Sequence, residues 1–136
     1  AGLKRLGLEA RLRQQLTQLL PAVGQGAVGI ETRINDAELH QLLAPLHHQE
    51  TALCVQAERA MNRRLQGGCQ VPIAGFATIN NQILTLNALV GSIDGLQIIH
   101  QQAQTQDLLA VESLGEHVAT GLLNQGAAAI LAAVYD

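Results

Sequence analysis

The spacing of apolar residues changes along the chain and divides it into helical and extended segments. Over residues 49–66 apolar side chains recur every three or four positions, which predicts an amphipathic helix. The same spacing returns over residues 107–124, and Gly126 is expected to end that helix. A short closing helix is predicted for residues 127–134.

Between the two longer helices the apolar spacing has a period of two, which is typical of strands with one buried face. Strands are predicted at residues 71–79, 83–90 and 96–102. The connections between them are short turns rich in Asn, Asp and Gly, and strands joined by short turns pair antiparallel. Residues 46–136 are therefore predicted to form an α+β domain, with helices covering one face of a three-stranded antiparallel sheet.

The first 45 residues predict a helix–loop–strand–helix arrangement. A leucine stripe over residues 3–20 predicts a helix that ends at Pro21. A glycine-rich loop then leads into a short strand at residues 27–31. Asp36, with the Asn before it, offers an N-cap for a helix over residues 37–46.

The strand predicted at residues 27–31 has no predicted partner in this part of the chain. A lone strand leaves its backbone N–H and C=O groups unpaired, so we expect it to pair with sequence outside this chain. The first residue is Ala1 rather than Met. We therefore expect a processed or truncated piece of a longer protein.

Composition excludes several classes of function. The 136 residues are 48% hydrophobic and 14% charged, which favours one folded domain over disorder. Only 1% are aromatic, so the core must be aliphatic and stacking platforms for single-stranded nucleic acid are not expected. No apolar run approaches the roughly 18–20 residues that cross a bilayer. Neither a nucleic acid nor a membrane is expected as a partner.

The charges are distributed unevenly. Residues 1–64 hold all eight basic residues against six acidic ones, whereas residues 65–136 hold five acidic residues and no basic one. The basic half favours an anionic partner, although its net charge of +2 is far below that of typical nucleic-acid binders. An ordinary solvated surface explains the charges equally well.

Cysteine and histidine usage favours a reducing compartment and no metal. Two cysteines are too few for a disulfide scaffold or a structural zinc site, and no secretory signal opens the chain. The cytoplasm is therefore the expected location. His40, His47 and His48 do not have zinc-ligand spacing, so no metal site is expected.

Cys69 is the strongest candidate for covalent chemistry. The glycine pair 67–68 before it leaves the loop free, and Arg63 and Arg64 one turn earlier favour the thiolate. The negative end of the preceding helix opposes this effect, and a small buried hydrophobe is the alternative interpretation. Cys54 lies on the apolar stripe of its helix and is expected to be structural.

Other motifs are weaker on their own. The Gly24-Gln25-Gly26 loop could hold a phosphate but lacks the remainder of a P-loop. A Cys–His pair between Cys69 and His47 or His48 has no orienting third group. The Glu58-Arg59 pair is interpreted as a local ion pair or a packing feature.

Taken together, several blocks of the sequence resemble the porphobilinogen deaminase family, also called hydroxymethylbilane synthases. The most distinctive block is Gly-Gly-Cys-Gln-Val-Pro-Ile at residues 67–73. The others, in the same register, are Leu-Pro-Ala-Val-Gly-Gln-Gly-Ala-Val-Gly-Ile-Glu (20–31), His-Gln-Glu-Thr-Ala (48–52), Ala-Glu-Arg-Ala-Met-Asn-Arg-Arg-Leu (57–65), Leu-Val-Gly (89–91) with Asp-Gly (94–95), and Leu-Leu-Asn-Gln-Gly-Ala (122–127).

The resemblance implies that the chain is the C-terminal portion of a three-domain enzyme. Residues 1–20 would be the tail of the second domain, and residues 21–45 a strand and helix that return to the first. Residues 46–136 would be the third domain, which carries the cofactor. The front segment is then a remnant of the two catalytic domains, which agrees with the lone strand.

The resemblance also implies a reaction. The family condenses four porphobilinogen units head to tail, with loss of ammonia, into hydroxymethylbilane for haem and other tetrapyrroles. A dipyrromethane cofactor is held by a thioether to the cysteine that matches Cys69. Arg5 matches a cleft arginine that binds acetate and propionate groups, and Gln25 matches a cleft residue near the cofactor. The implied partners are porphobilinogen, the growing polypyrrole chain and the missing N-terminal domains.

The sequence departs from the family pattern in two places. Thr32 stands where many relatives have a second cysteine, and Ala74 replaces a usual glycine. The family's catalytic aspartate belongs to the absent domains, so no catalytic residue is expected within this chain. We predict that it is inactive alone. The alternative is a stand-alone, non-catalytic binding or interaction module derived from the third domain.

Overall fold

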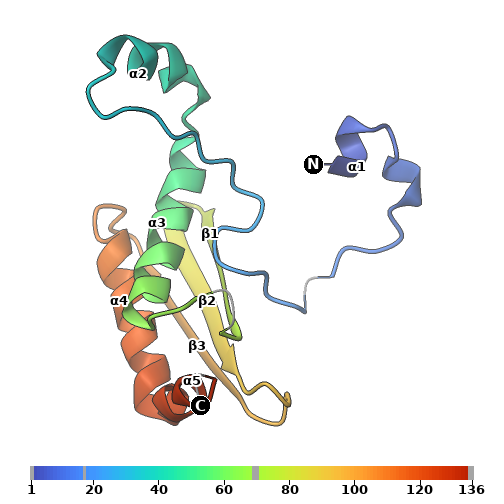
Figure 1. Ribbon diagram of the computed structural model, residues 1–136, viewed down its shortest axis with the longest axis vertical. Helices are drawn as coiled ribbons and strands as arrows, with labels where there is room; N and C mark the ends of the chain where they lie inside the picture. The colour runs from blue at the N-terminus through green and yellow to red at the C-terminus, as the bar shows by residue number, and fades with distance from the viewer. Residues whose placement is uncertain (1, 17, 69–70, 135–136) are drawn as a thin grey trace.

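A computed structural model describes residues 2–16, 18–68 and 71–134 (Figure 1). Its folded part is an α+β domain with one sheet and one helical layer. The elements of this domain are α3 (Gln49–Arg64), β1 (Ile73–Asn80), β2 (Ile83–Gly91), β3 (Ile98–Thr105), α4 (Val111–Leu122) and α5 (Ala128–Ala132). The predicted fold class is confirmed.

The three strands form an antiparallel meander in the order β1-β2-β3. In its centre Leu86 of β2 lies opposite Ala77 of β1 and Ala103 of β3. Helices α3 and α4 lie side by side across one face of this sheet (Figure 1). The β2 residues that point toward them are fully buried: Leu84, Leu86, Ala88 and Val90. The alternation of apolar residues in the sequence therefore predicted correctly which face of β2 is buried.

The two helices cross closely because glycine stands at the contact. A Cβ on Gly115 of α4 would collide with the Ala57 carbonyl oxygen and lie 2.9 Å from Ala60 Cβ, both in α3. After helix α4 the chain is kinked within Leu123–Ala127, where Gly126 has a non-helical φ of 103°. This left-handed residue separates α4 from α5, as the sequence predicts. None of the helices in the described ranges is long and apolar enough to cross a membrane.

The helix predicted at 37–46 is present in two parts. Helix α2 (Ala37–Leu43) begins where Asp36 accepts a hydrogen bond from the Leu39 N–H at 3.2 Å, so the predicted cap is confirmed. A 3₁₀ turn (Ala44–Leu46) containing Pro45 follows. Proline has no N–H to donate, which explains why the α-helix stops before it.

The prediction of a helix over residues 3–20 is wrong for most of this segment. Only α1 (Gly2–Arg5) and a 3₁₀ turn (Glu9–Arg11) form, in a segment that lies apart from the sheet (Figure 1). The leucines of the stripe find no surface to cover, and Leu6 and Leu12 are 70% and 60% exposed. Most helical stability comes from packing of the apolar face, which this segment lacks.

The strand predicted at residues 27–31 is also absent. This segment is extended but pairs with no described strand, and Val28 is 91% exposed. A strand exists only where its backbone groups have a partner, and the described part of the chain provides none. Its pairing with sequence outside this chain stays a prediction.

The glycine at the helix crossing offers a test of the packing. We expect Gly115→Ala to lower the free energy of unfolding by about 1–3 kcal/mol, because the added methyl meets helix backbone that cannot yield. Gly121→Ala on the same helix is the matched control, since its methyl meets only the Gln101 side chain, which can move. Urea denaturation measures both. Equal destabilisation would show that the crossing does not depend on Gly115.

Candidate functional site

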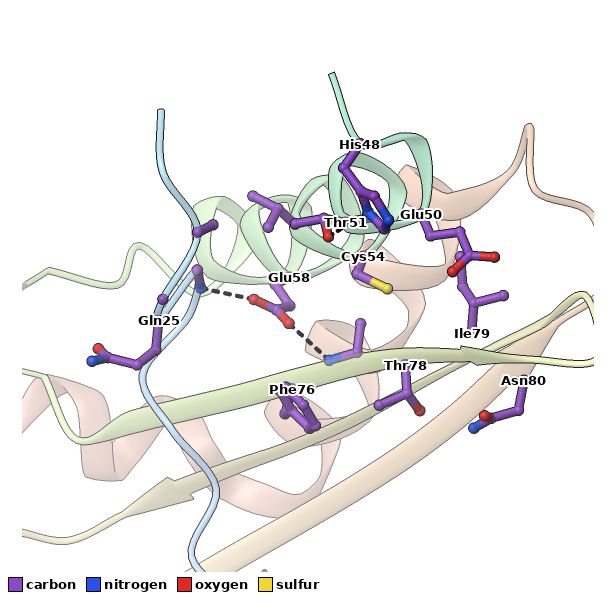
Figure 2. Close-up of a pocket in the computed structure, with 15 residues that line it drawn as sticks. Gln25, His48, Glu50, Thr51, Cys54, Glu58, Phe76, Thr78, Ile79 and Asn80 are labelled. Atoms are coloured by element: carbon purple, nitrogen blue, oxygen red, sulfur yellow. Dashed lines mark hydrogen bonds between the residues drawn. The ribbon is translucent and has the colours of Figure 1, made fainter. Parts of the chain in front are cut away.

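A cavity of about 480 Å³ opens beside β1, at one edge of the sheet. The glycine-rich loop around Gln25 forms one wall, the N-terminal half of α3 a second, and β1 the third (Figure 2). Its lining is mixed: Thr51 and Asn80 are polar, whereas Cys54 and Phe76 are largely apolar. The cavity thus brings together three segments that are distant in the sequence.

Glu58 lies at the base of this cavity and joins its walls. Its side chain is 4% exposed, and it is the only buried charged residue in the described ranges. Oε2 accepts a hydrogen bond from the Gly24 N–H at 2.7 Å, and Oε1 accepts one from the Ala77 N–H at 2.8 Å (Figure 2). Burial raises the pKa of Glu58, and the bonds from Ala77 and Gly24 partly offset this increase.

The loop reaches this position by following the edge of β1. The Pro21 carbonyl accepts a hydrogen bond from the Gly75 N–H at 3.1 Å, two residues before the Ala77 N–H that Glu58 binds. Met61 packs closely against Gly75, and a Cβ there would lie 2.7 Å from Met61 Cε. Two edge N–H groups of β1 are therefore satisfied by residues outside the sheet.

The geometry of Glu58 argues against two interpretations made from the sequence, the phosphate-binding loop and the Glu58-Arg59 ion pair. The Gly24 N–H already binds a carboxylate, so the loop is not a phosphate cradle: Glu58 would repel an anion there. Glu58 also makes no ion pair with Arg59 in the described structure. The ion pair that α3 makes among the described residues is at its other end, between Arg63 and Glu112 of α4, at 3.5 Å.

A second cavity of about 560 Å³ adjoins the first and is also lined by the glycine-rich loop. It shares Gly24, Gly26 and Thr51 with the first cavity, and it adds His47 and the exposed Arg59. The glycine-rich loop therefore lines both cavities. Any movement of the loop would change the width of both.

Cys54 lines the first cavity and is partly buried. Burial raises the pKa of its thiol, and the nearby carboxylates Glu58 and Glu50 raise it further. The thiol, not the thiolate, is therefore the favoured form near neutral pH. This agrees with its placement on the apolar stripe of α3, although one side of the residue faces the cavity.

The histidines have local partners. His48 accepts a hydrogen bond from the Thr51 N–H at 3.3 Å and thereby caps α3. His47 lies 3.0 Å from Gln49 Oε1, and His40 lies 2.9 Å from Thr32 Oγ1. Within residues 2–16, 18–68 and 71–134, no group of three or more His, Cys, Asp or Glu side chains could hold a metal ion.

The structure separates the residues that the sequence singled out. Gln25 lies at the wall of the first cavity. Arg5 is exposed at the end of α1, a helix that lies apart from α3 and the sheet (Figure 1), and it does not line that cavity. Cys69 lies outside the described residues. Its proposed role and those of Arg5 and Gln25 stay predictions.

The described residues before and after Cys69 are held firmly. The Gly67 N–H donates to the Asn62 carbonyl at 2.9 Å, and Asn62 Nδ2 donates to the Gly67 carbonyl at 3.3 Å. Gln66, with a φ of 55°, turns the chain at the end of α3, and Val71 is buried in the core. Both attachment points of this short loop are therefore part of the folded domain.

The binding of two backbone amides by Glu58 is not predicted from the sequence, where only the neighbouring Arg59 is considered as its partner. A signal was present, because Glu58 occupies the apolar stripe of α3 four residues after Cys54 and three before Met61. A charged residue at a buried helical position needs a hydrogen-bonding partner. The partners themselves, two backbone amides, carry no sequence signal.

Two family models match the chain. Residues 52–124, more than half of the chain, match the model described as "Porphobilinogen deaminase, C-terminal domain". Residues 1–41 match the model described as "Porphobilinogen deaminase, dipyromethane cofactor binding domain". The two matches follow one another along the chain without overlap.

The raised pKa of Cys54 predicts low reactivity. At pH 8 we expect iodoacetamide to alkylate Cys54 more slowly in the folded chain than in the urea-unfolded chain, because less thiolate is present. The rate should rise only at a pH above that at which an ordinary thiol ionises. Glu50→Gln removes a carboxylate that raises this pKa, so it should speed the reaction, whereas the exposed Glu116→Gln should not. Peptide mass spectrometry measures each rate, and faster alkylation in the folded chain would contradict the prediction.

Proposed function

Because the chain belongs to the porphobilinogen deaminase family, we propose that it forms the C-terminal part of a hydroxymethylbilane synthase. The enzyme would be a transferase that condenses four porphobilinogen units head to tail, with loss of one ammonia at each step. The match over residues 52–124 carries this proposal, because it includes the Gly-Gly-Cys-Gln-Val-Pro block.

We propose a division of the chain at two places. Residues 1–20 would close the second domain of the enzyme, residues 21–45 would return to the first, and residues 46–136 would form the third. The unpaired segment 27–31 and the exposed leucines of the front segment support this division, since both need partners that the described chain does not supply.

Cys69 is the proposed attachment point for a dipyrromethane cofactor. A cysteine is chemically suited to this attachment. The thiolate of Cys69 would bond to the methylene carbon of a porphobilinogen unit, and the amine would leave as ammonia. Asn62 and Val71 fit this role because they hold the two ends of the loop. When bound, the dipyrromethane supplies the pyrrole end from which the chain grows. A reduced thiol is required, which favours the cytoplasm.

Arg5 and Gln25 are the proposed contacts to the bound pyrroles. An arginine binds a carboxylate through two parallel N–H bonds, so Arg5 would suit acetate and propionate groups. Gln25 can donate and accept hydrogen bonds from the rim of its cavity. The two residues would meet the same ligand only in a cleft completed by the other domains.

We expect the 136-residue chain to be inactive by itself. The aspartate that the family uses for proton transfer would belong to another domain, and such help is worth about 10²–10⁴ in rate. Incubation with porphobilinogen, followed by acid oxidation and fluorescence detection of uroporphyrin, measures turnover. Formation of uroporphyrin by the isolated chain would contradict this prediction.

Co-production with the remaining domains tests the attachment point. We expect the intact mass of the chain to increase by two linked pyrrole units, and peptide mapping to place the adduct on residues 67–72. Cys69→Ser should abolish the adduct because its hydroxyl is a much weaker nucleophile, whereas Cys54→Ala should keep it. No adduct on the wild-type chain would favour a non-catalytic module, and an adduct on Cys54 would overturn the assignment.

A further inference from the structure

We propose that Glu58 is a positioning residue that holds in place the Gln25 loop, which lines both cavities. Its carboxylate binds the Gly24 N–H in the loop and the Ala77 N–H in β1, at 2.7 and 2.8 Å. One side chain of α3 thereby sets the distance between the loop and the sheet edge. Gln25 is the next residue after Gly24, so its position depends on this link.

Few other bonds hold the loop. The Gln25 and Ala27 N–H groups donate to carbonyls of the loop itself, those of Ala22 and Gly24. For residues 24–31, the bond to Glu58 is the only hydrogen bond to another element among the described residues. Removing the carboxylate would therefore free the loop without breaking the sheet.

Both hydrogen bonds depend on the residue at position 58 being a glutamate. A carboxylate has two acceptor oxygens, and Glu58 uses one on each N–H. Glutamine keeps one acceptor and turns an NH₂ group toward the other N–H. Aspartate keeps the charge but is shorter by one methylene group, so it cannot span both N–H groups from the same helix. Only glutamate satisfies both the geometry and the number of acceptors.

The consequence for the reaction rests on the proposed function. If Gln25 contacts the bound pyrroles, Glu58 determines where that contact is made, because it holds the Gln25 loop. Small displacements of a positioning group are costly in rate, on the order of 10²-fold for 1 Å. The loop also forms a wall of both cavities, so its displacement would alter them together.

Amide hydrogen exchange by NMR on the 136-residue chain tests the positioning role. We expect Glu58→Ala to speed exchange at Gly24 at least tenfold, relative to Leu86 in the central strand. Glu58→Gln and Glu58→Asp should each speed exchange at least tenfold at one of the two bonded amides, Gly24 or Ala77. Glu116→Gln, the same charge change on an exposed face of α4, should leave these ratios unchanged.

The outcomes separate positioning from general stability. If the Gln and Asp variants protect both amides as the wild type does, Glu58 does not hold the loop. If Leu86 accelerates by the same factor as Gly24, the residue has only a general structural role. The Gln and Asp variants keep the test usable even where the Ala variant does not fold.

Activity measured with the remaining domains present tests the link to the reaction. We expect Glu58→Gln to lower kcat at least tenfold, and Glu116→Gln to change it less than twofold. If Gly24 exchange is faster in Glu58→Gln but kcat is unchanged, the position of the loop does not affect the reaction. Absence of any pyrrole adduct on the wild-type protein would instead overturn the proposed function, while the exchange result would still decide the positioning role.

Discussion

Burial of one carboxylate constrains the arrangement of this domain. An ion removed from water costs several kcal/mol unless hydrogen bonds compensate it, and no cation pairs with Glu58 in the described structure. The compensation comes from the backbone of Gly24 and Ala77, which lie 34 and 19 residues away in the sequence. The glycine-rich loop and the edge of β1 are therefore held against helix α3 through this one side chain.

The sequence predicted the α+β domain well because its core is periodic. The buried residues of β2 alternate with partly exposed ones, and those of α3 and α4 recur at helical spacing. Turn residues marked the turn between β1 and β2, although β3 begins and ends two to three residues later than predicted. Asp36 and Gly126 marked helix ends by their side-chain and backbone preferences. Each of these signals is local, so a single sequence contains it.

The rest could not be predicted because it depends on contacts between distant segments. The leucines of residues 3–20 have the spacing of a helix, but spacing does not supply a surface to pack against. The segment 27–31 has the residues of a strand without a neighbour. Glu58 could have been flagged by its buried position, yet its two amide partners became visible only in the structure. The roles of Cys69, Arg5 and Gln25 depend on the resemblance and stay predictions.

The loop after α3 limits how far any attached group can travel. Three residues separate Gly67, which Asn62 holds, from the buried Val71. An extended chain spans about 3.3–3.6 Å per residue, so a group joined to this loop stays within about 10 Å of its anchors, apart from its own length. Its effective concentration near the domain is then on the order of millimolar or more, whatever its non-covalent affinity. A covalently held group would not diffuse away between successive turnovers, even if its contacts with the domain were weak.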